Sequence, residues 1–539
     1  MKEIKKNCIT SFLISAIVLI AGIGLYKLLD FSYQRLGQNE DIIDTDFGLF
    51  LASQHALYVN DFDNASKMIQ RVKSDKKIVN QTKNIASFFN GKLPENADSL
   101  KNSKELVDGM IYDAYLIQKD DWKSLYNRHA KDESILAAPL RIFSAINQKR
   151  YTETLKYIDS MQTSDSWKSF VRGQIAVLRD DIDTATKEFA NVHPDFMNIN
   201  DYLYLMSFYK HYDMTADMDI LRNDFLAKPG GMYAFEYPDI PDWSTYSGYK
   251  NNLVFSIIQT ISHTQIMLYT DLSLMFLRFS EIISDGQNTD AINYYLGQYY
   301  FYNSGDYETS FNKINKHNPL YLFGQLKIAE KNNDMKTIQK IANDNPLFVP
   351  AFLTTVHEHI KNGNKSAALR LINRGLKHKH LSDLGRIYFL KQRAHTYLMF
   401  KNPSRAQRDI SEIQAISDEK TPDVIFLQAR IWEQQNKNLN EAYNYTMNLI
   451  KINKSDVNAW DLLGLIIYKR EGIENALEIL EHIGETSTNT SSIYEHLGDL
   501  YAIKGDKERA LRAYNHALDL SDDCLVVVPQ ILKKIRKLK

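Results

Sequence analysis

The chain of 539 residues is too long for one hydrophobic core, so it indicates either several domains or a repeat array. Its 44% hydrophobic and 24% charged residues are typical of a folded protein, and 65 basic against 66 acidic residues exclude a general nucleic-acid binder. Two cysteines, Cys8 and Cys524, exclude a disulfide framework and a thiolate zinc site. The scarcity of glycine (22) and proline (12) favours an all-α protein.

The first thirty residues differ from the rest. No charged side chain lies between Asn7 and Tyr26, and twenty helical residues rise about 30 Å, the thickness of the bilayer interior. This run predicts a single N-terminal transmembrane helix, with residues 1–30 forming a cytoplasmic tip and anchor and residues 7–29 contacting the membrane. A cleaved signal peptide is the alternative, but the run ends at Gly22-Ile-Gly24 without a good cleavage site, which favours a retained anchor.

The flanking charges predict the orientation of this helix. Lys2, Lys5, Lys6 and the terminal amine precede it, whereas only Lys27 and Arg35 follow it closely. Because cations are retained on the cytoplasmic side, the N-terminus is expected inside. The prediction is therefore a single-pass protein of the cytoplasmic (inner) membrane, with the bulk of the chain in the periplasm.

Short polar turns recur along residues 31–194, each followed by a small residue. Asn60-Asp-Phe62 leads to Ala65, and Asp181-Ile-Asp183 leads to Ala185. Turns of this kind between amphipathic stretches predict helical hairpins.

Residues 195–290 form an atypical helical block that contains a proline-rich and aromatic segment, 225–249. Proline at this density stops helices, so we expect a long ordered loop. Two interpretations stay open for its aromatic side chains, which either pack on neighbouring helices or form a partner-binding surface: Tyr233, Phe235, Tyr237 and Trp243. We expect Trp243 to be buried and the tyrosines to be partly exposed.

The C-terminal half repeats every 34 residues. The two best copies, 457–490 and 491–524, agree at seven positions: Trp460 with Tyr494, Leu463 with Leu497, Gly464 with Gly498, Ile467 with Tyr501, Ala476 with Ala510, Leu480 with Tyr514, and Ile483 with Ala517. This pattern resembles the tetratricopeptide repeat (TPR) family. The resemblance implies an α-solenoid of helix hairpins wound as a right-handed superhelix behind the N-terminal helix.

The predicted domains follow from this resemblance. Residues 291–524 form the TPR array, and residues 31–194 form degenerate TPR-like hairpins. Residues 525–539 form a basic capping helix with Ile531, Ile535 and Leu538 on one face. The Gly-Gly-Met-Tyr string at 230–233 is similar to a segment of alphaproteobacterial envelope proteins that carry these repeats, so the chain resembles membrane-anchored periplasmic TPR proteins of that group.

No motif for catalysis is present in the sequence. It lacks a glycine-rich phosphate loop and a nucleophile elbow. His357 and His359 are two apart on an expected helix and point to different faces, which disfavours a metal site. We therefore predict no enzyme activity, no catalytic residue, no cofactor and no metal.

The resemblance implies binding of other proteins or their peptide segments in the groove lined by the first helix of each hairpin. The candidate groove residues are Lys391, His395, Gln428, Ile431, Asn458, Asp461, Leu465, Glu495 and Asp499. The acidic trio Asp461, Glu495 and Asp499 would suit a basic segment or form a solvated face.

The predicted function is a non-enzymatic scaffold that binds envelope proteins. Two alternatives remain: a cytoplasm-facing adaptor or regulator of envelope biogenesis, and an enzyme with its site in residues 195–290.

Overall fold

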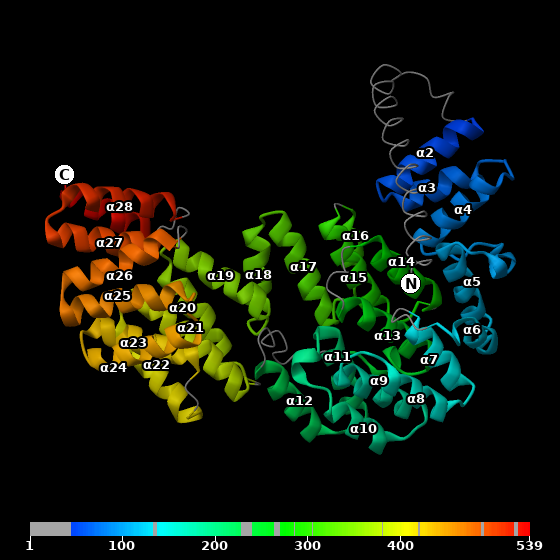
Figure 1. Ribbon diagram of the computed structural model, residues 1–539, viewed down its shortest axis with the longest axis horizontal. Helices are drawn as coiled ribbons and strands as arrows, with labels where there is room; N and C mark the ends of the chain where they lie inside the picture. Colours follow the sequence, from blue (N-terminus) through cyan, green and yellow to red (C-terminus); the bar gives the residue numbers. More distant parts are fainter. Residues whose placement is uncertain are drawn as a thin grey trace. The chain divides into compact units, whose positions relative to one another are not determined.

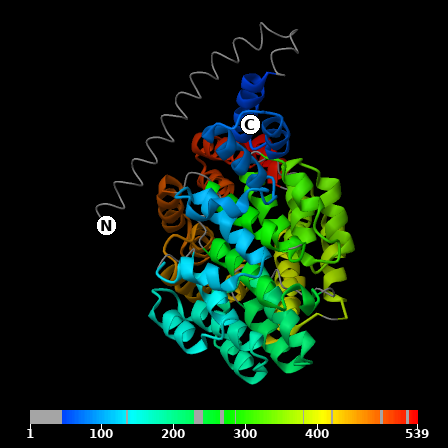
Figure 2. The ribbon, with the colours of Figure 1, turned by 90° about the vertical axis from the view of Figure 1, so that its right-hand side faces the viewer.

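The computed structural model describes residues 45–132, 137–227, 240–263, 270–284, 286–303, 305–379, 381–418, 421–486, 490–521 and 527–538. Every element in these ranges is a helix, as Figures 1 and 2 show from two directions. The predicted all-α class is therefore confirmed for the described part of the chain.

The chain divides into two compact units. The first holds the described residues up to Leu125 together with residues 271–284, and the second holds the described residues of Tyr126–Thr270 and Gly286–Lys539. The domain boundaries expected at residues 30, 194, 290 and 524 stay predictions.

The first unit contains α2 (Asp46–Tyr58), α3 (Phe62–Gln70), α4 (Lys77–Phe89), the 3-10 helix η2 (Ala97–Asn102), α5 (Leu106–Gln118) and α14 (Asp271–Ile283). Its core includes Leu49, Ala65 and Ile69. Although α14 is distant in sequence, it packs against α4 and α5. The side-chain amide of Gln118 donates a 3.1 Å hydrogen bond to the carbonyl oxygen of Ile282, which fixes α14 to α5.

The first half of the second unit has an aromatic core. Its helices are α7 (Ala138–Asn147), α8 (Tyr151–Ser160), α9 (Asp165–Leu178), α10 (Ile182–Ala190), α11 (Ile199–His211), α12 (Thr215–Ala227) and α13 (Tyr249–His263), with α6 (Trp122–His129) at the boundary and short 3-10 helices η3 (Pro194–Phe196) and η5 (Trp243–Thr245). The ring of Tyr204 lies 5.2 Å from that of Phe170 and 4.4 Å from that of Phe255. Buried rings of this size dominate the packing energy of a core.

Trp243 belongs to this aromatic core. It is 6% exposed, and its ring meets that of Tyr204 edge-on at 5.2 Å. Its burial agrees with what we expected of this residue. Tyr233, Phe235 and Tyr237 lie outside the described residues.

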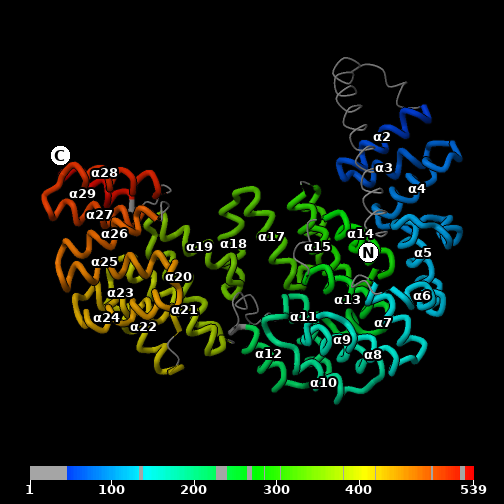
Figure 3. The backbone as a smooth tube through the Cα atoms, viewed as in Figure 1, coloured from blue at the N-terminus to red at the C-terminus, as the bar shows by residue number. Residues whose placement is uncertain are grey.

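The rest of the second unit is a series of helical hairpins that follow one another along the chain (Figure 3). Its helices are α15 (Thr289–Tyr302), α16 (Tyr307–Asn312), α17 (Pro319–Lys331), α18 (Met335–Asp344), α19 (Val349–Lys361), α20 (Lys365–Leu376), α21 (Asp383–Met399), α22 (Pro403–Ile416), α23 (Pro422–Gln435), α24 (Leu439–Ile452), α25 (Val457–Glu471), α26 (Ile473–Thr486), α27 (Ser491–Lys504), α28 (Lys507–Asp519) and α29 (Val527–Leu538).

Small residues allow close helix contact in the last two hairpins. A Cβ atom on Gly464 of α25 would lie 2.5 Å from a methyl group of Leu480 on α26. One on Gly498 of α27 would lie 2.5 Å from the ring of Tyr514 on α28. Only glycine fits at such separations, so the 34-residue register is confirmed at these positions.

The final helix, α29, covers the end of this series by packing against α28. Ile531 and Ile535 are buried in the same hydrophobic cluster as Leu497, Ala513 and Ala517. The apolar face of α29 therefore continues the core of the preceding hairpin.

Among the described residues, no helix is long and apolar enough to cross a bilayer. The longest, α21, has 17 residues, which rise about 26 Å, and it carries Arg386, Lys391 and Arg393. This finding contradicts the predicted localisation as a single-pass inner-membrane protein with a periplasmic bulk. The segment that motivated the prediction, residues 7–29, lies outside the described residues.

Candidate functional site

The hairpin series curves toward its first helices. Each of the first helices α21, α23 and α25 contacts the first helix of the next hairpin, so that α21, α23, α25 and α27 form a continuous row. Among the described helices, the second helices α22, α24, α26 and α28 make no comparable contact with one another. Because the first helices approach more closely than the second, they lie on the concave side of the array. We call this surface the concave face.

Several of the predicted groove residues are accessible. His395 of α21 and Asn458 of α25 are exposed, and the following are partly exposed: Lys391, Leu465, Glu495 and Asp499. Lys391 extends toward α23, where its ammonium pairs with the carboxylate of Asp423 at 3.0 Å. These side chains are within reach of a ligand on the concave face.

Three of the predicted groove residues, Gln428, Ile431 and Asp461, are buried rather than open to a ligand, and the first two show why. Gln428 of α23 is 4% exposed, and its amide group exchanges hydrogen bonds of 2.9 and 3.1 Å with Gln407 of α22. Ile431 is 0% exposed and lies in a cluster with Leu390 and Leu398 of α21. The close packing of α21 on α23 covers Ile431, so neither residue can contact a ligand.

A row of ion pairs joins successive first helices and joins the last of them, α27, to the capping helix α29. A carboxylate of one helix pairs with a cation of the next: Glu433 of α23 with Lys469 of α25 at 2.8 Å, Asp461 of α25 with His496 of α27 at 2.7 Å, and Asp499 of α27 with Lys534 of α29 at 2.6 Å. Lys534 also pairs with Glu495 at 2.7 Å. All three carboxylates of the predicted acidic trio therefore have partners within the chain, which removes the reason for expecting a basic ligand.

The Asp461–His496 pair changes the pKa of both groups. Burial on its own would lower the pKa of His496, but the attraction of the Asp461 carboxylate outweighs it and raises that pKa. Burial likewise opposes ionisation of Asp461, yet the charge of His496 and the hydroxyl of Ser492, 3.0 Å away, lower the pKa of Asp461. The pair is thus favoured as a carboxylate and an imidazolium.

The pKa of His395 is shifted in the opposite direction from that of His496. Desolvation by the surrounding protein, together with the charges of the nearby His357 and Arg430, lowers the pKa of His395. His395 is therefore a neutral hydrogen-bonding group near pH 7 rather than a cation.

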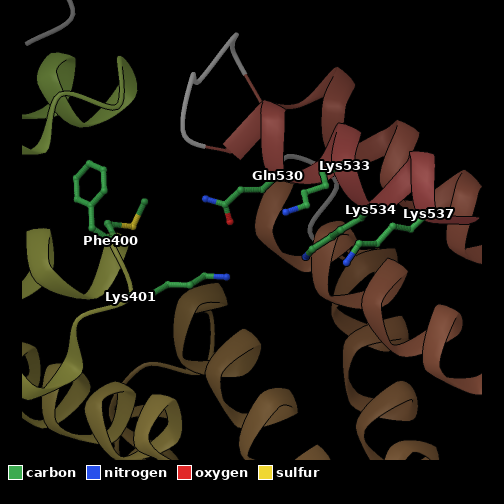
Figure 4. Close-up of a pocket in the computed structure, with 7 residues that line it drawn as sticks. Phe400, Lys401, Gln530, Lys533, Lys534 and Lys537 are labelled. Atoms are coloured by element: carbon green, nitrogen blue, oxygen red, sulfur yellow. The ribbon is translucent and has the colours of Figure 1, made fainter.

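A cavity of about 450 Å³ lies between two parts of the array that are distant in sequence. One wall is the turn after α21, with Met399, Phe400 and Lys401, and the other is α29, with Gln530, Lys533, Lys534 and Lys537 (Figure 4). We call this site the basic cleft. The sequence predicts α29 only as a basic capping helix, and Lys401 is not among the predicted site residues.

A buried polar cluster in the predicted atypical block has a structural role. The carboxylate of Asp201 lies 2.7 Å from Nε2 of His263 and accepts a 2.9 Å hydrogen bond from the amide of Gln259. It also accepts a bond from the backbone N–H of Asn198 at 3.0 Å, which completes the N-terminal cap of α11. These contacts tie α11 to α13.

In the described part of the chain, no group of three or more metal-binding side chains is present.

No family model matches the chain, and no curated protein matches it. The solved structures to which it is similar include TPR proteins. The thermophilic TPR protein TTC0263 of Thermus thermophilus shares 17% identity over 34% of this chain and 97% of its own, with a TM-score of 0.29. A TPR protein from Parabacteroides merdae shares 14% over 48% and 95%, with a TM-score of 0.33. Yeast Tom70 shares 11% over 92% and 95%, with a TM-score of 0.27. Scores this low carry no argument about function.

Proposed function

We propose that this protein is an interaction scaffold that binds a segment of another protein along the concave face. The observation that carries the proposal is the curvature of the array, which places α21, α23, α25 and α27 side by side on its inner surface. Such a surface can contact an extended segment over several hairpins, because each first helix adds side chains to one continuous groove.

The accessible side chains suit a peptide ligand. The neutral imidazole of His395 and the side-chain amide of Asn458 can each donate and accept hydrogen bonds, and the partly exposed Leu465 offers an apolar contact. Peptides are recognised by this combination of apolar anchors and a few placed polar groups.

The expectation of envelope partners depended on the membrane localisation and is not part of the proposal. The expected lack of enzyme activity stays a prediction.

Site-specific photo-crosslinking tests the proposal. Peptides that bind the full chain are first selected from a random display library. A benzophenone amino acid is then placed at His395 or Asn458 on the concave face and, as controls, at exposed Glu478 of α26 or Arg512 of α28. We expect the selected peptides to crosslink from the two concave positions and not from the controls. Crosslinks of equal yield from all four positions, or from the controls alone, would contradict a concave binding site.

A further inference from the structure

The basic cleft has two walls that the curvature of the array brings together. Lys401 follows α21, whereas Lys533, Lys534 and Lys537 lie on α29. Figure 4 shows Lys401 extending from one wall and Lys533 from the other toward the space between them. A ligand in this space can therefore meet cations from two sides.

The positive charge of the cleft is only partly neutralised. Lys534 pairs with Glu495 and Asp499 of α27, at 2.7 and 2.6 Å. Lys401, Lys533 and Lys537 are exposed and have no carboxylate partner among the described residues. Four lysines against two carboxylates leave an excess of two positive charges. Same-sign charges converging on one cavity repel one another, and an anionic ligand would relieve that repulsion.

The cleft also has an apolar part. Met399 and Phe400 line the wall opposite α29, and both are partly exposed. The Phe400 ring additionally lies 5.5 Å from the ammonium of Lys365, so a further cation is close to this wall. A ligand that fills the cleft would combine negative charge with an apolar side chain.

We propose that the basic cleft binds an acidic segment of a partner protein, in which glutamate or aspartate alternates with apolar side chains. This inference rests on the proposed function, because it identifies the class of segment that the array binds. A peptide fits better than a membrane, since the lysines come from two separate walls, the turn after α21 and helix α29, rather than from one face of a single helix. It also fits better than a nucleic acid, because a chain with a net charge of −1 lacks the broad positive surface that phosphate binding requires.

The test compares two labelled peptides by fluorescence anisotropy with the full chain. One peptide alternates glutamate with leucine, and the other has glutamine in place of each glutamate. We expect the glutamate peptide to bind about tenfold more tightly, and the difference to shrink as salt is added. The double variant Lys533→Glu/Lys537→Glu should remove this preference.

A matched control has the same charge change at the same spacing. Lys336 and Lys340 are exposed on α18, four residues apart as in the cleft, so Lys336→Glu/Lys340→Glu tests for a general electrostatic effect. We expect it to leave the affinity for the glutamate peptide within about twofold, because the change is remote from the ligand. Thermal midpoints of both double variants should match that of the wild type, since all four side chains are exposed.

Three results would overturn the proposal. These are equal affinity for the two peptides, an equal loss of affinity in both double variants, and lysine-dependent binding of phosphatidylserine vesicles with no binding of the glutamate peptide. Failure of this proposal is distinguishable from failure of the proposed function. Peptides from the random library would still crosslink at His395 and Asn458 if the concave face binds a segment of other chemistry.

Discussion

The imidazole Nδ1 of His496 on α27 lies 2.7 Å from the carboxylate Oδ1 of Asp461 on α25. Both side chains are largely buried, and each changes the pKa of the other in the direction that favours the ionised pair. The pair therefore joins two adjacent first helices by a charged hydrogen bond in the interior of the array. Bonds of this kind contribute about 1.5–3 kcal/mol each.

The first prediction concerns the pH dependence of this contact. Because the pKa of His496 is raised in the folded protein, its contribution to stability is complete below about pH 6.5, the unfolded value, and is lost as the pH rises through the raised pKa. Amide hydrogen exchange in α25 and α27, corrected for its intrinsic pH dependence, should therefore show weaker protection above neutral pH.

The variant His496→Gln separates charge from hydrogen bonding. Glutamine can still donate a hydrogen bond to Asp461 but does not titrate, so the corrected protection should become independent of pH over this range. Parallel pH profiles for the wild type and the variant would show that the pair does not stabilise the array through its charge.

The second prediction concerns the glycines between paired helices. Gly498→Ala places a methyl group 2.5 Å from the Tyr514 ring and should lower the free energy of unfolding by about 1–3 kcal/mol. Gly484 of α26 is the matched control, because a Cβ there would meet its nearest atom, in Leu497, at an ordinary 3.4 Å. Gly484→Ala should be neutral or stabilising by up to about 1 kcal/mol, as alanine favours a helix. Equal denaturant midpoints for the two variants would contradict the packing described here.

The sequence predicts local features of the array better than contacts between distant helices. Gly464 and Gly498 are recognisable in the sequence because they are 34 residues apart, and the close contact of each lies within its own hairpin. The burial of Ile431 does not follow from the sequence, because it depends on how closely α21 approaches α23. Repeat patterns specify the faces of a helix, whereas the tilt between hairpins decides which positions at the edge of a face are covered.

The basic cleft could not be predicted for a related reason. Lys401 and Lys533 are far apart in the sequence, and only the curvature of the intervening hairpins places them at one cavity. A sequence signal for the Asp461–His496 pair does exist, because the other two carboxylate–cation pairs of this row have a similar spacing of 35 or 36 residues. The aromatic segment has the same limit. Its composition predicts that Trp243 is buried, but it does not identify the side chains that surround Trp243.

The third prediction tests this aromatic core. The Trp243 ring lies 5.2 Å from Tyr204 and 5.5 Å from Phe208, so Trp243→Ala should cost about 3–5 kcal/mol by leaving a cavity among buried rings. Trp243→Phe retains much of the buried ring and should cost considerably less. Denaturant unfolding of both variants, followed by far-UV circular dichroism, measures the difference. Wild-type stability in Trp243→Ala would show that the residue does not belong to the core.

The last prediction concerns the role of α29 in the stability of the array. Ile531 is 0% exposed, whereas the adjacent Leu532 is 37% exposed, so the two substitutions to alanine remove similar apolar volume from opposite environments. Ile531→Ala should cost about 2–5 kcal/mol, because it leaves a cavity in the cluster that joins α29 to the last hairpin. Leu532→Ala should stay within about 0.5 kcal/mol. Amide exchange in α28 is the local measurement, since α29 packs directly on that helix. We expect faster exchange in Ile531→Ala only, and equal protection in the two variants would mean that α29 is a solvated tail rather than part of the core.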